Sequence, residues 1–338
     1  MRCRNKANSM RVILRFTVGF IMGLFVLGIG NIQYVEGSSW HKGRFHKAES
    51  LTCGETITTH AVLYNDLDCS SDDSDGPALT LGEGASLDLN GKKVIGNYDR
   101  NCIEITGDGA EVRNGIVKHC NNGIVITSNG NKITDVKVSD SASNGILVDK
   151  NTKGNEIRYV KVSDSGSRGI RIRGDENLLM TCSVANSGSQ GIQIDGTSSN
   201  KIYRIIVDHS GRQGIQINGG NFNEISGSTV RDSCRDGIEI EGDQNSVFYN
   251  QVEDNGNPEA CPPSEVYNPS EYAGIDVTEG SQENEIKGNR ACGNLGCFGT
   301  DCIATERNFW DENSPNRWEY NSIMCRNVKP KFSGTPPH

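Results

Sequence analysis

Residues 190–195 read Gln-Gly-Ile-Gln-Ile-Asp, and the pattern returns as Gln-Gly-Ile-Gln-Ile-Asn at 213–218 and Asp-Gly-Ile-Glu-Ile-Glu at 236–241. The Gly-Ile pair recurs along much of the chain, with its glycines at positions 123, 145, 169, 191, 214, 237 and 274. Six of these seven glycines follow one another every 22 to 24 residues, and the last comes after an insertion. A period of this length is typical of a solenoid, in which each repeat buries its apolar side against its neighbours.

The pattern inside each repeat predicts short β-strands. Ile-x-Ile after the glycine places alternate side chains on opposite faces of a strand. Two more short segments follow, one near an Asn-x-Ile, as at 155–157, and one ending in Val and a polar pair, as at 162–164. The repeats show neither a helical period of 3.6 nor the Leu-dominated consensus of leucine-rich repeats. We therefore expect an all-β chain, a parallel β-helix of about ten coils stacked about 4.8 Å apart.

The two ends of the chain differ from the repeats. Five basic residues precede an apolar run from Phe16 to Gly30, and 15 apolar residues are short for crossing a bilayer, so residues 1–37 are interpreted as a secretory signal peptide. Residues 38–78 are expected to form a linker and an N-terminal cap, and residues 79–326 the β-helix. The Pro-containing residues 327–338 are expected to be a disordered tail.

Charge and cysteine content agree with an extracellular protein. The chain has a formal charge of −9, and loss of residues 1–37 leaves 29 basic against 42 acidic residues, a net charge of −13. Such a surface argues against nucleic acid as partner. Without the signal segment no membrane association is expected, and the protein should be a monomer. An acidic polymer would need a local basic patch or a bridging cation such as Ca²⁺.

The twelve cysteines predict disulfides in an oxidising compartment. The expected pairs are Cys53–Cys69, Cys102–Cys120 and, at the base of the inserted loop, Cys234–Cys261. Cys182 aligns with the core position Val160 of the preceding repeat and is expected to be a buried free thiol. Cys3 would be lost with the signal peptide. The last four are expected to staple the C-terminal coils, with zinc as the alternative; they are Cys292, Cys297, Cys302 and Cys325.

A family resemblance becomes specific at the start of the repeats. Leu-Thr-Cys-Gly-Glu-Thr-Ile-Thr at 51–58, Leu-Asp-Leu-Asn-Gly at 87–91 and Val-Arg-Asn-Gly-Ile-Val at 112–117 resemble secreted right-handed parallel β-helix proteins of the pectate-lyase-like superfamily. The resemblance implies a right-handed helix with disulfide-stapled caps. Function is open, because the superfamily includes lyases, hydrolases, epimerases, copper-loading accessory proteins and tailspike depolymerases. The Asp-Pro-His-Asp motif of bacterial mannuronan epimerases is absent, its nearest match being Asp208-His209-Ser210.

The Gly-Ile strands predict which side chains line the outer face of one sheet. From Arg171 onward these positions are polar over about five coils, roughly 20–25 Å. Arg171 and Arg173 are two residues apart and could clamp a uronate carboxylate. The other outward side chains are candidates for binding sugar hydroxyls, holding a cation or acting as acid and base: Gln193, Asp195, Gln216, Asn218, Glu239, Glu241 and Asp276. An ordinary solvated sheet would also be polar, so this alternative stays open.

Two further features could complete a site. His209 stands where other repeats have Asp or Asn, and with Arg231 and Arg235 nearby it could abstract a proton next to a carboxylate. The insertion 258–272 follows this polar part of the sheet, and its Tyr267, or Tyr272, could protonate a leaving oxygen. A surface turn and a simple loop are the alternatives.

Three functions fit these features. The first is a secreted lyase or epimerase acting on uronic-acid-containing polysaccharide, with Arg171, Arg173, His209 and Tyr267 as catalytic residues. The second is an inverting glycoside hydrolase using Asp195, Glu241 and Asp276, because two coils separate Asp195 from Glu241 by roughly 9.6 Å. The third is a non-catalytic protein of the extracellular space or cell wall that binds glycans or has a structural role.

Overall fold

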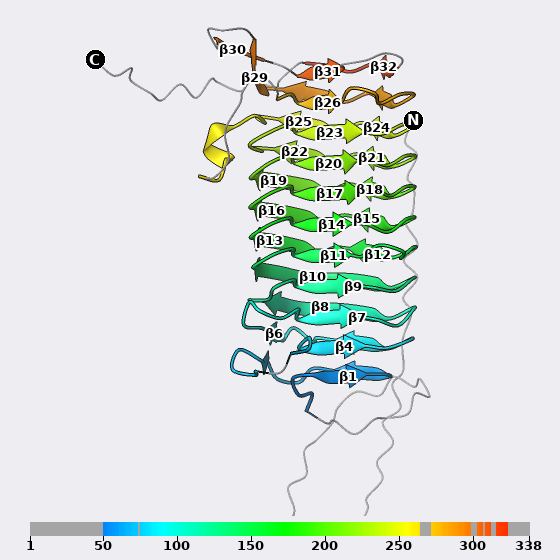
Figure 1. The fold of residues 1–338 in the computed structure, drawn as a ribbon, viewed down its shortest axis with the longest axis vertical. Coiled ribbons are helices and arrows are strands. Elements are labelled where there is room, and N and C mark those ends of the chain that lie inside the picture. The colour runs from blue at the N-terminus through cyan, green and yellow to red at the C-terminus, as the bar shows by residue number, and fades with distance from the viewer. Residues whose placement is uncertain are drawn as a thin grey trace, which may run out of the picture. The chain divides into compact units, whose positions relative to one another are not determined.

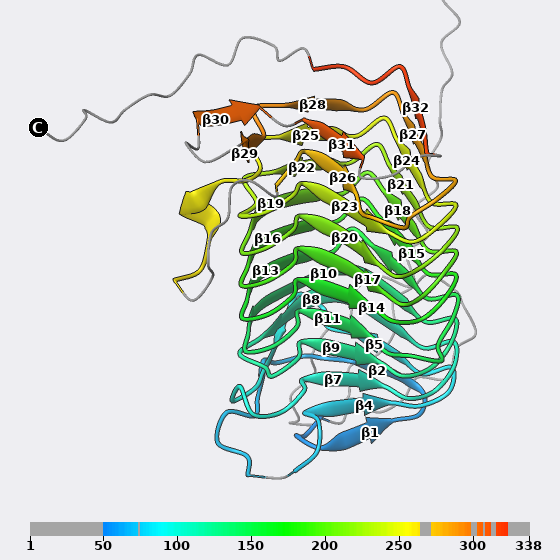
Figure 2. The same ribbon diagram turned by 45° about the horizontal axis from the view of Figure 1, so that its top comes forward.

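A computed structural model describes residues 50–73, 75–263, 272–298, 303–306, 308–311 and 316–323. These residues wind as a right-handed parallel β-helix and contain essentially no α-helix, which confirms the predicted fold. Figures 1 and 2 show the coils stacked one above another from β1 to β31. The predicted signal peptide and tail lie outside the described residues, as does almost all of the predicted linker. No helix among the described residues is long and apolar enough to span a membrane.

The Gly-Ile segments form one parallel sheet, called sheet A, which faces the viewer in Figure 1. Each coil contributes one short strand, paired in register with the next. The described strands, in spatial order, are β1 (Glu55–Ile57), β4 (Leu79–Leu81), β7 (Ile103–Ile105), β9 (Ile124–Ile126), β11 (Ile146–Val148), β14 (Ile170–Ile172), β17 (Ile192–Asp195), β20 (Ile215–Asn218), β23 (Ile238–Glu241), β26 (Ile275–Val277) and β31 (Phe309–Asp311).

The other two segments of each coil form the two ladders of sheet B, which meet in β8 (Glu111–Lys118) and β10 (Lys132–Ser141). The first ladder also holds β2 (His60–Val62), β5 (Ser86–Asp88), β12 (Glu156–Arg158), β15 (Leu178–Met180), β18 (Lys201–Tyr203), β21 (Glu224–Ser226), β24 (Ser246–Phe248), β27 (Glu285–Lys287) and β32 (Arg317–Glu319). The second also holds β3 (Leu67–Asp68), β6 (Lys93–Ile95), β13 (Lys161–Ser165), β16 (Ser183–Ser187), β19 (Ile206–Ser210), β22 (Thr229–Arg231), β25 (Gln251–Glu253) and β28 (Arg290–Cys292). An antiparallel pair, β29 (Leu295–Phe298) and β30 (Ile303–Glu306), and the 3₁₀ turn η1 (Pro258–Ala260) complete the elements.

The core consists of aliphatic columns that run parallel to the helix axis. Ile170, Ile192, Ile215 and Ile238 lie in register on neighbouring strands of sheet A and are fully buried. β1 already pairs with β4, so the stacking of coils begins closer to the N-terminus than residue 79. Apolar side chains of one coil therefore cover those of the next, which is why a single repeat could not be stable alone.

The asparagine of each Asn-x-Ile segment is also buried. The backbone N–H of Asn177 donates to Oδ1 of Asn200, and that of Asn200 donates to Oδ1 of Asn223, each at 2.9 Å. Equivalent bonds start at Asn131 and continue to Asn316. These side chains satisfy backbone donors at a corner where the strands end, so they keep successive coils in register.

The disulfides follow the predicted pairs. Cys53–Cys69, Cys102–Cys120 and Cys234–Cys261 are bonded, and Cys182 is free and buried. Burial raises the pKa of the Cys182 thiol to about 11, so the thiol stays neutral and inert at physiological pH. Cys292 is also disulfide-bonded, which excludes it as a zinc ligand. The side chains of the other three C-terminal cysteines lie outside the described residues.

Candidate functional site

The outer face of sheet A gathers the side chains that the sequence predicted there. Strand pairing aligns Arg171, Gln193, Gln216, Glu239 and Asp276 in one column across β14, β17, β20, β23 and β26. A second column holds Asp195, Asn218 and Glu241. A strand turns alternate residues to one face, so polar residues at the same position of successive repeats form a continuous polar surface.

The sequence did not lead us to predict a third column of side chains on this face. It consists of the residues that immediately precede the glycines: Arg168, Gln190, Gln213 and Asp236. Hydrogen bonds join it to the first column, since Gln190 donates to Gln216 at 2.8 Å and Gln213 donates to Glu239 at 2.6 Å. The repeat could have predicted this column, because the residue before Gly-Ile is Asn in the earlier repeats and Arg, Gln or Asp in the later ones.

The middle of the face is a network of amides. Gln193 donates to Oε1 of Gln216 at 2.8 Å, and Gln216 donates to Oε1 of Glu239 at 2.5 Å. Gln193 and Gln216 are only 4% and 8% exposed. The sequence predicted hydrogen-bonding groups open to solvent, and this point needs correction. The glutamines point outward from the sheet, but their neighbours on the same face cover them and use their hydrogen-bonding capacity.

One end of the face is basic. Arg168 donates to Gln193 at 2.6 Å, Arg171 forms an ion pair with Asp195, and Arg173 pairs with Asp149 at 3.0 Å. Burial, and then the neighbouring Arg171, lower the pKa of Arg168. The two predicted clamp arginines therefore lie on the expected face, partly exposed, but each already has a carboxylate partner.

Asp195 belongs to this basic end and not to a pair with Glu241. Burial alone would raise the pKa of Asp195, but hydrogen bonds from Arg171 and Asn218 outweigh burial and lower it. The Asn218 bond is 2.9 Å long. Asp195 is therefore held as a carboxylate, suited to fixing the arginines, whereas Glu241 is exposed on β23.

The other end of the face is acidic and buried. Carboxylate oxygens of Asp236, Glu239 and Asp276 lie within 4.8 Å of one another. Asp236 and Asp276 are 3% and 7% exposed, and Asp236 accepts the backbone N–H of Ala273 at 2.6 Å. Burial, and then Asp276 and Glu239, raise the pKa of Asp236 well above its ordinary value. A carboxyl group that stays protonated beside carboxylates is a feature of acid–base sites. The set offers only oxygen ligands, which also suit Ca²⁺.

Replacing Asp236 with asparagine should stabilise the protein at alkaline pH. The pKa of Asp236 is higher in the folded than in the unfolded chain. The contribution of Asp236 to stability is therefore fully present below its pKa in the unfolded chain, about 3.9. That contribution is lost as pH rises through the raised pKa. Asparagine keeps an acceptor for Ala273 and cannot ionise. We expect Asp236→Asn to gain about 1–3 kcal/mol at pH 8 and almost nothing at pH 4, measured by urea unfolding.

The matched control for this measurement is Asp108→Asn. Asp108 also accepts a backbone N–H, that of Asn129 at 2.8 Å, but it is exposed. Its substitution should change stability by less than about 0.5 kcal/mol at either pH. Equal stabilities of wild type and Asp236→Asn at pH 8 would show that Asp236 is not a protonated, crowded carboxyl.

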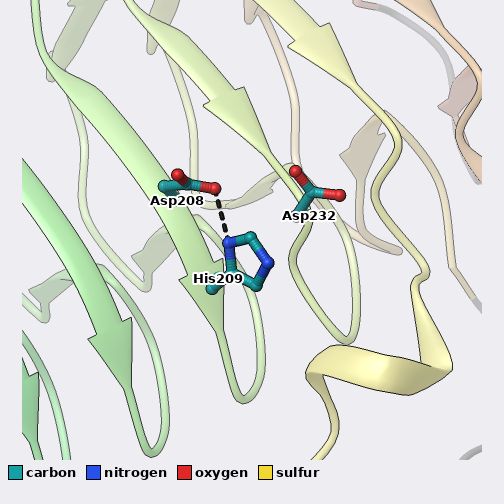
Figure 3. A group of neighbouring side chains, drawn as sticks. All are labelled: Asp208, His209 and Asp232. Atoms are coloured by element: carbon teal, nitrogen blue, oxygen red, sulfur yellow. Dashed lines mark hydrogen bonds and ion pairs between the residues drawn. The ribbon is translucent and has the colours of Figure 1, made fainter.

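His209 lies apart from sheet A, on β19 of sheet B. Its Nδ1 is 2.7 Å from Oδ1 of Asp208, and Arg231 donates to the other oxygen of Asp208 at 2.9 Å. Figure 3 shows His209 with Asp208 and Asp232, three groups that could together hold a metal ion. The His209 side chain is 54% exposed. His209 therefore pairs with Asp208, while Arg171 and Arg173 pair with other carboxylates on sheet A.

The inserted segment begins at the acidic end of the face. η1 is anchored by the Cys234–Cys261 disulfide, and Arg235 lies 5.9 Å from the ring centre of Tyr272. Tyr272 is buried, with 3% exposure. The predicted proton donor Tyr267 lies outside the described residues. The two described ends of the insertion are therefore fixed beside the coils that carry Asp236 and Asp276.

Comparison with known proteins identifies the fold. Residues 122–291 match the family model described as the right-handed β-helix region. A variant of the periplasmic alginate epimerase AlgG is similar in structure, with a TM-score of 0.61 and 12% identity over 81% of this chain and 71% of that chain. The Dettilon tailspike protein has a TM-score of 0.58 and 14% identity over 77% of this chain. No curated protein matches the sequence.

The chain is shorter than the viral proteins it resembles. It spans 60% of the Dettilon tailspike chain and 50% of Geobacillus virus E2 ORF18, which has a TM-score of 0.50 and 10% identity over 79% of this chain. At these identities the similarity establishes the fold, and the chemistry has to be argued from the residues on the outer face of sheet A.

Proposed function

Because this chain belongs to the right-handed β-helix family, we propose that it is a secreted enzyme that hydrolyses an acidic polysaccharide on the outer face of sheet A. The observation that carries the proposal is the buried trio of Asp236, Glu239 and Asp276, in which one carboxyl has a raised pKa. Glycoside hydrolysis needs one protonated and one ionised carboxyl group. The three described disulfides support an oxidising compartment outside the cytosol.

The environment of each carboxyl group suggests its role. The raised pKa of Asp236 favours its protonated form, so Asp236 would donate a proton to the leaving oxygen. Glu239 accepts hydrogen bonds from Gln213 and Gln216, which hold its carboxyl group in place, and it would attack the anomeric carbon. Asp276 is buried beside them and helps to keep Asp236 protonated. The separation within 4.8 Å is closer to that of retaining enzymes than to that of inverting enzymes.

The rest of the face would orient the polymer. Arg168 and Arg171 lie three coils from the acidic trio, roughly 14 Å at the spacing of β-strands. A uronate carboxylate could replace Asp195 as partner of Arg171. Asn218, the partly exposed amide between the two ends, could bind a sugar hydroxyl. Because the charge changes from positive to negative along the axis, an acidic chain would place its carboxylates at the arginines and a glycosidic bond at the trio.

A second candidate is β-elimination or epimerisation at uronate residues. Arg171 on β14 and Arg173 just after it favour this candidate, because both reactions begin with neutralisation of a uronate carboxylate and removal of the adjacent proton. Arg171 and Arg173 would neutralise the carboxylate, or Ca²⁺ bound at the acidic trio would do so. His209 would take the proton and Tyr267 would protonate the leaving oxygen. This route requires His209 to leave Asp208 and reach the substrate from another sheet.

Product analysis separates these reactions. The secreted chain is incubated with pectate, polymannuronate and polyguluronate, with and without Ca²⁺, and new reducing ends and ultraviolet absorbance are followed. We expect reducing ends without absorbance, because hydrolysis forms no double bond. An absorbance increase would replace hydrolysis by β-elimination, and a change in uronate composition without cleavage would show epimerisation. Binding without any product would leave a non-catalytic glycan-binding protein.

A further inference from the structure

A second surface lies on sheet B, at the corner between its two ladders. Strand pairing aligns the last residue of each strand in the first ladder. The residue that follows it in each coil turns outward at the corner. Coils that present an aromatic ring alternate with coils that present none. The aromatic stripe consists of Tyr159, Tyr203, Phe248, Tyr249 and Tyr320; the intervening coils hold Met180-Thr181, Ser226-Gly227 and Lys287-Gly288.

The rings of the stripe are open to solvent. Tyr159, Tyr249 and Tyr320 are 50%, 67% and 83% exposed. Tyr203 is half-buried, and the guanidinium of Arg204 lies 4.7 Å from its ring centre. Apolar rings exposed in a row, and not singly, indicate an interaction surface.

Glycines of the next coil leave room for two of these rings. A Cβ on Gly288 would lie 2.5–2.6 Å from the ring of Tyr249, so the tyrosine ring packs directly on the glycine of the next coil. Tyr203 and Arg204 pack in the same way over Gly227, at 3.8 and 3.6 Å from its Cβ position. A glycine therefore follows an aromatic coil where the ring needs room to lie along the axis.

The tyrosines also occupy strained positions. Tyr159, Tyr249 and Tyr320 have φ of 55°, 55° and 52°, a region that bulky side chains seldom adopt. The corner imposes this φ on successive coils, because Thr181 and Arg204 also have φ of 55° and 53° there, and Asp135 and Gly227 are residue types that tolerate it. The chain thus keeps large rings at a corner where Asn, Asp or Gly would fit the backbone more easily.

We propose that the aromatic stripe binds an extended, uncharged β-1,4-linked glucan. Rings repeat every second coil, roughly 9.6 Å apart, and a β-1,4-linked glucan presents the same face of a sugar ring at every second residue with a similar repeat. Sugar rings stack on aromatic faces through their C–H groups. Charged groups beside the stripe are engaged by one another or by the rings: Arg158 pairs with Glu156, Lys287 pairs with Glu285 and Glu319, and the Arg204 guanidinium lies over the Tyr203 ring. The Lys287 ammonium also lies 5.8 Å from the ring centre of Tyr320. This arrangement favours an uncharged chain.

This surface is separate from the acidic trio and independent of the hydrolysis proposed for it. The stripe lies on the corner of sheet B, whereas the trio lies on the outer face of sheet A. Binding there would hold the protein on one wall polymer while the face of sheet A acts on another.

Sedimentation with microcrystalline cellulose tests the stripe. We expect the secreted chain to sediment with cellulose, and Tyr249→Asn to weaken binding about tenfold through loss of one stacked ring. The triple variant Tyr159→Asn/Tyr249→Asn/Tyr320→Asn should stay in the supernatant. Asparagine tolerates positive φ, so these variants should fold at least as well as wild type, checked by thermal unfolding.

The matched control is Phe222→Asn. Phe222 is 60% exposed, also has a positive φ of 58°, and lies on the turn between β20 and β21, away from the stripe. It should bind cellulose like wild type. The proposal is overturned if wild-type protein does not sediment, if the triple variant binds equally, or if Phe222→Asn loses binding to the same extent. Tyrosine-dependent binding to a polymannuronate gel and not to cellulose would also overturn it.

Discussion

Glu239→Gln is expected to lower polysaccharide hydrolysis roughly 10³-fold. Glutamine keeps the size of the side chain and can still accept from one of the two glutamines that bond Glu239. It cannot attack an anomeric carbon as a carboxylate does. Asp236→Asn should lose activity to a similar extent, because the amide cannot protonate the leaving oxygen. Reducing ends released from the polyuronate cleaved by wild type measure both effects.

The matched control for this substitution is Glu111→Gln. Glu111 begins β8 on sheet B and takes part only in a partly exposed ion pair with Arg113, at 3.7 Å. Full activity is expected. The roles assigned to the trio are wrong if Glu239→Gln stays active. A lyase product that survives both trio substitutions but is lost in an Arg171→Gln/Arg173→Gln variant would place the chemistry at the basic end.

Gly214→Ala is expected to destabilise the protein by about 3 kcal/mol or more. A Cβ at this position would lie 2.7 Å from the carbonyl oxygen of Gly237 and 2.9 Å from Oγ of Ser233, and it would collide with Val230. The carbonyl belongs to the backbone of the next coil and cannot turn away. The whole stack would have to open locally, so the midpoint of urea unfolding should fall.

Gly76→Ala is the control for that prediction. A Cβ on Gly76 meets no atom within 4 Å, and its φ is not positive, so alanine should be neutral or slightly stabilising. If both variants unfold at the same urea concentration, the glycine before each isoleucine is not required for close approach between coils.

The period of Gly-Ile was sufficient to predict the fold because a solenoid is built from local rules. Each repeat makes the same turn and contacts only its neighbours, so the order of strands in space follows their order in the chain. Alignment of the repeats also placed Cys182 in the core. The alternation of Ile-x-Ile also predicted which residues share a face, from Arg171 to Asp276.

The chemistry of that face could not be predicted in the same way. Sequence position shows that Gln216 and Asp276 turn outward, but not that neighbouring side chains bury them. It likewise does not show that Asp195 and Asp149 form ion pairs with the two arginines, because these pairs join adjacent coils and depend on side-chain direction. In the sequence Asp236 lies in the turn before a Gly-Ile strand. Its pKa is raised because the fold buries it and brings Asp276 and Glu239 beside it.

The sequence by itself determined the β-helix, its register and the columns of residues, because these follow from a repeated local pattern. Tertiary structure alone decided which groups are charged, buried or already bonded. The free energy of an ionised group depends on every neighbour within a few ångströms, and in a solenoid those neighbours come from coils 22 to 39 residues apart in the chain.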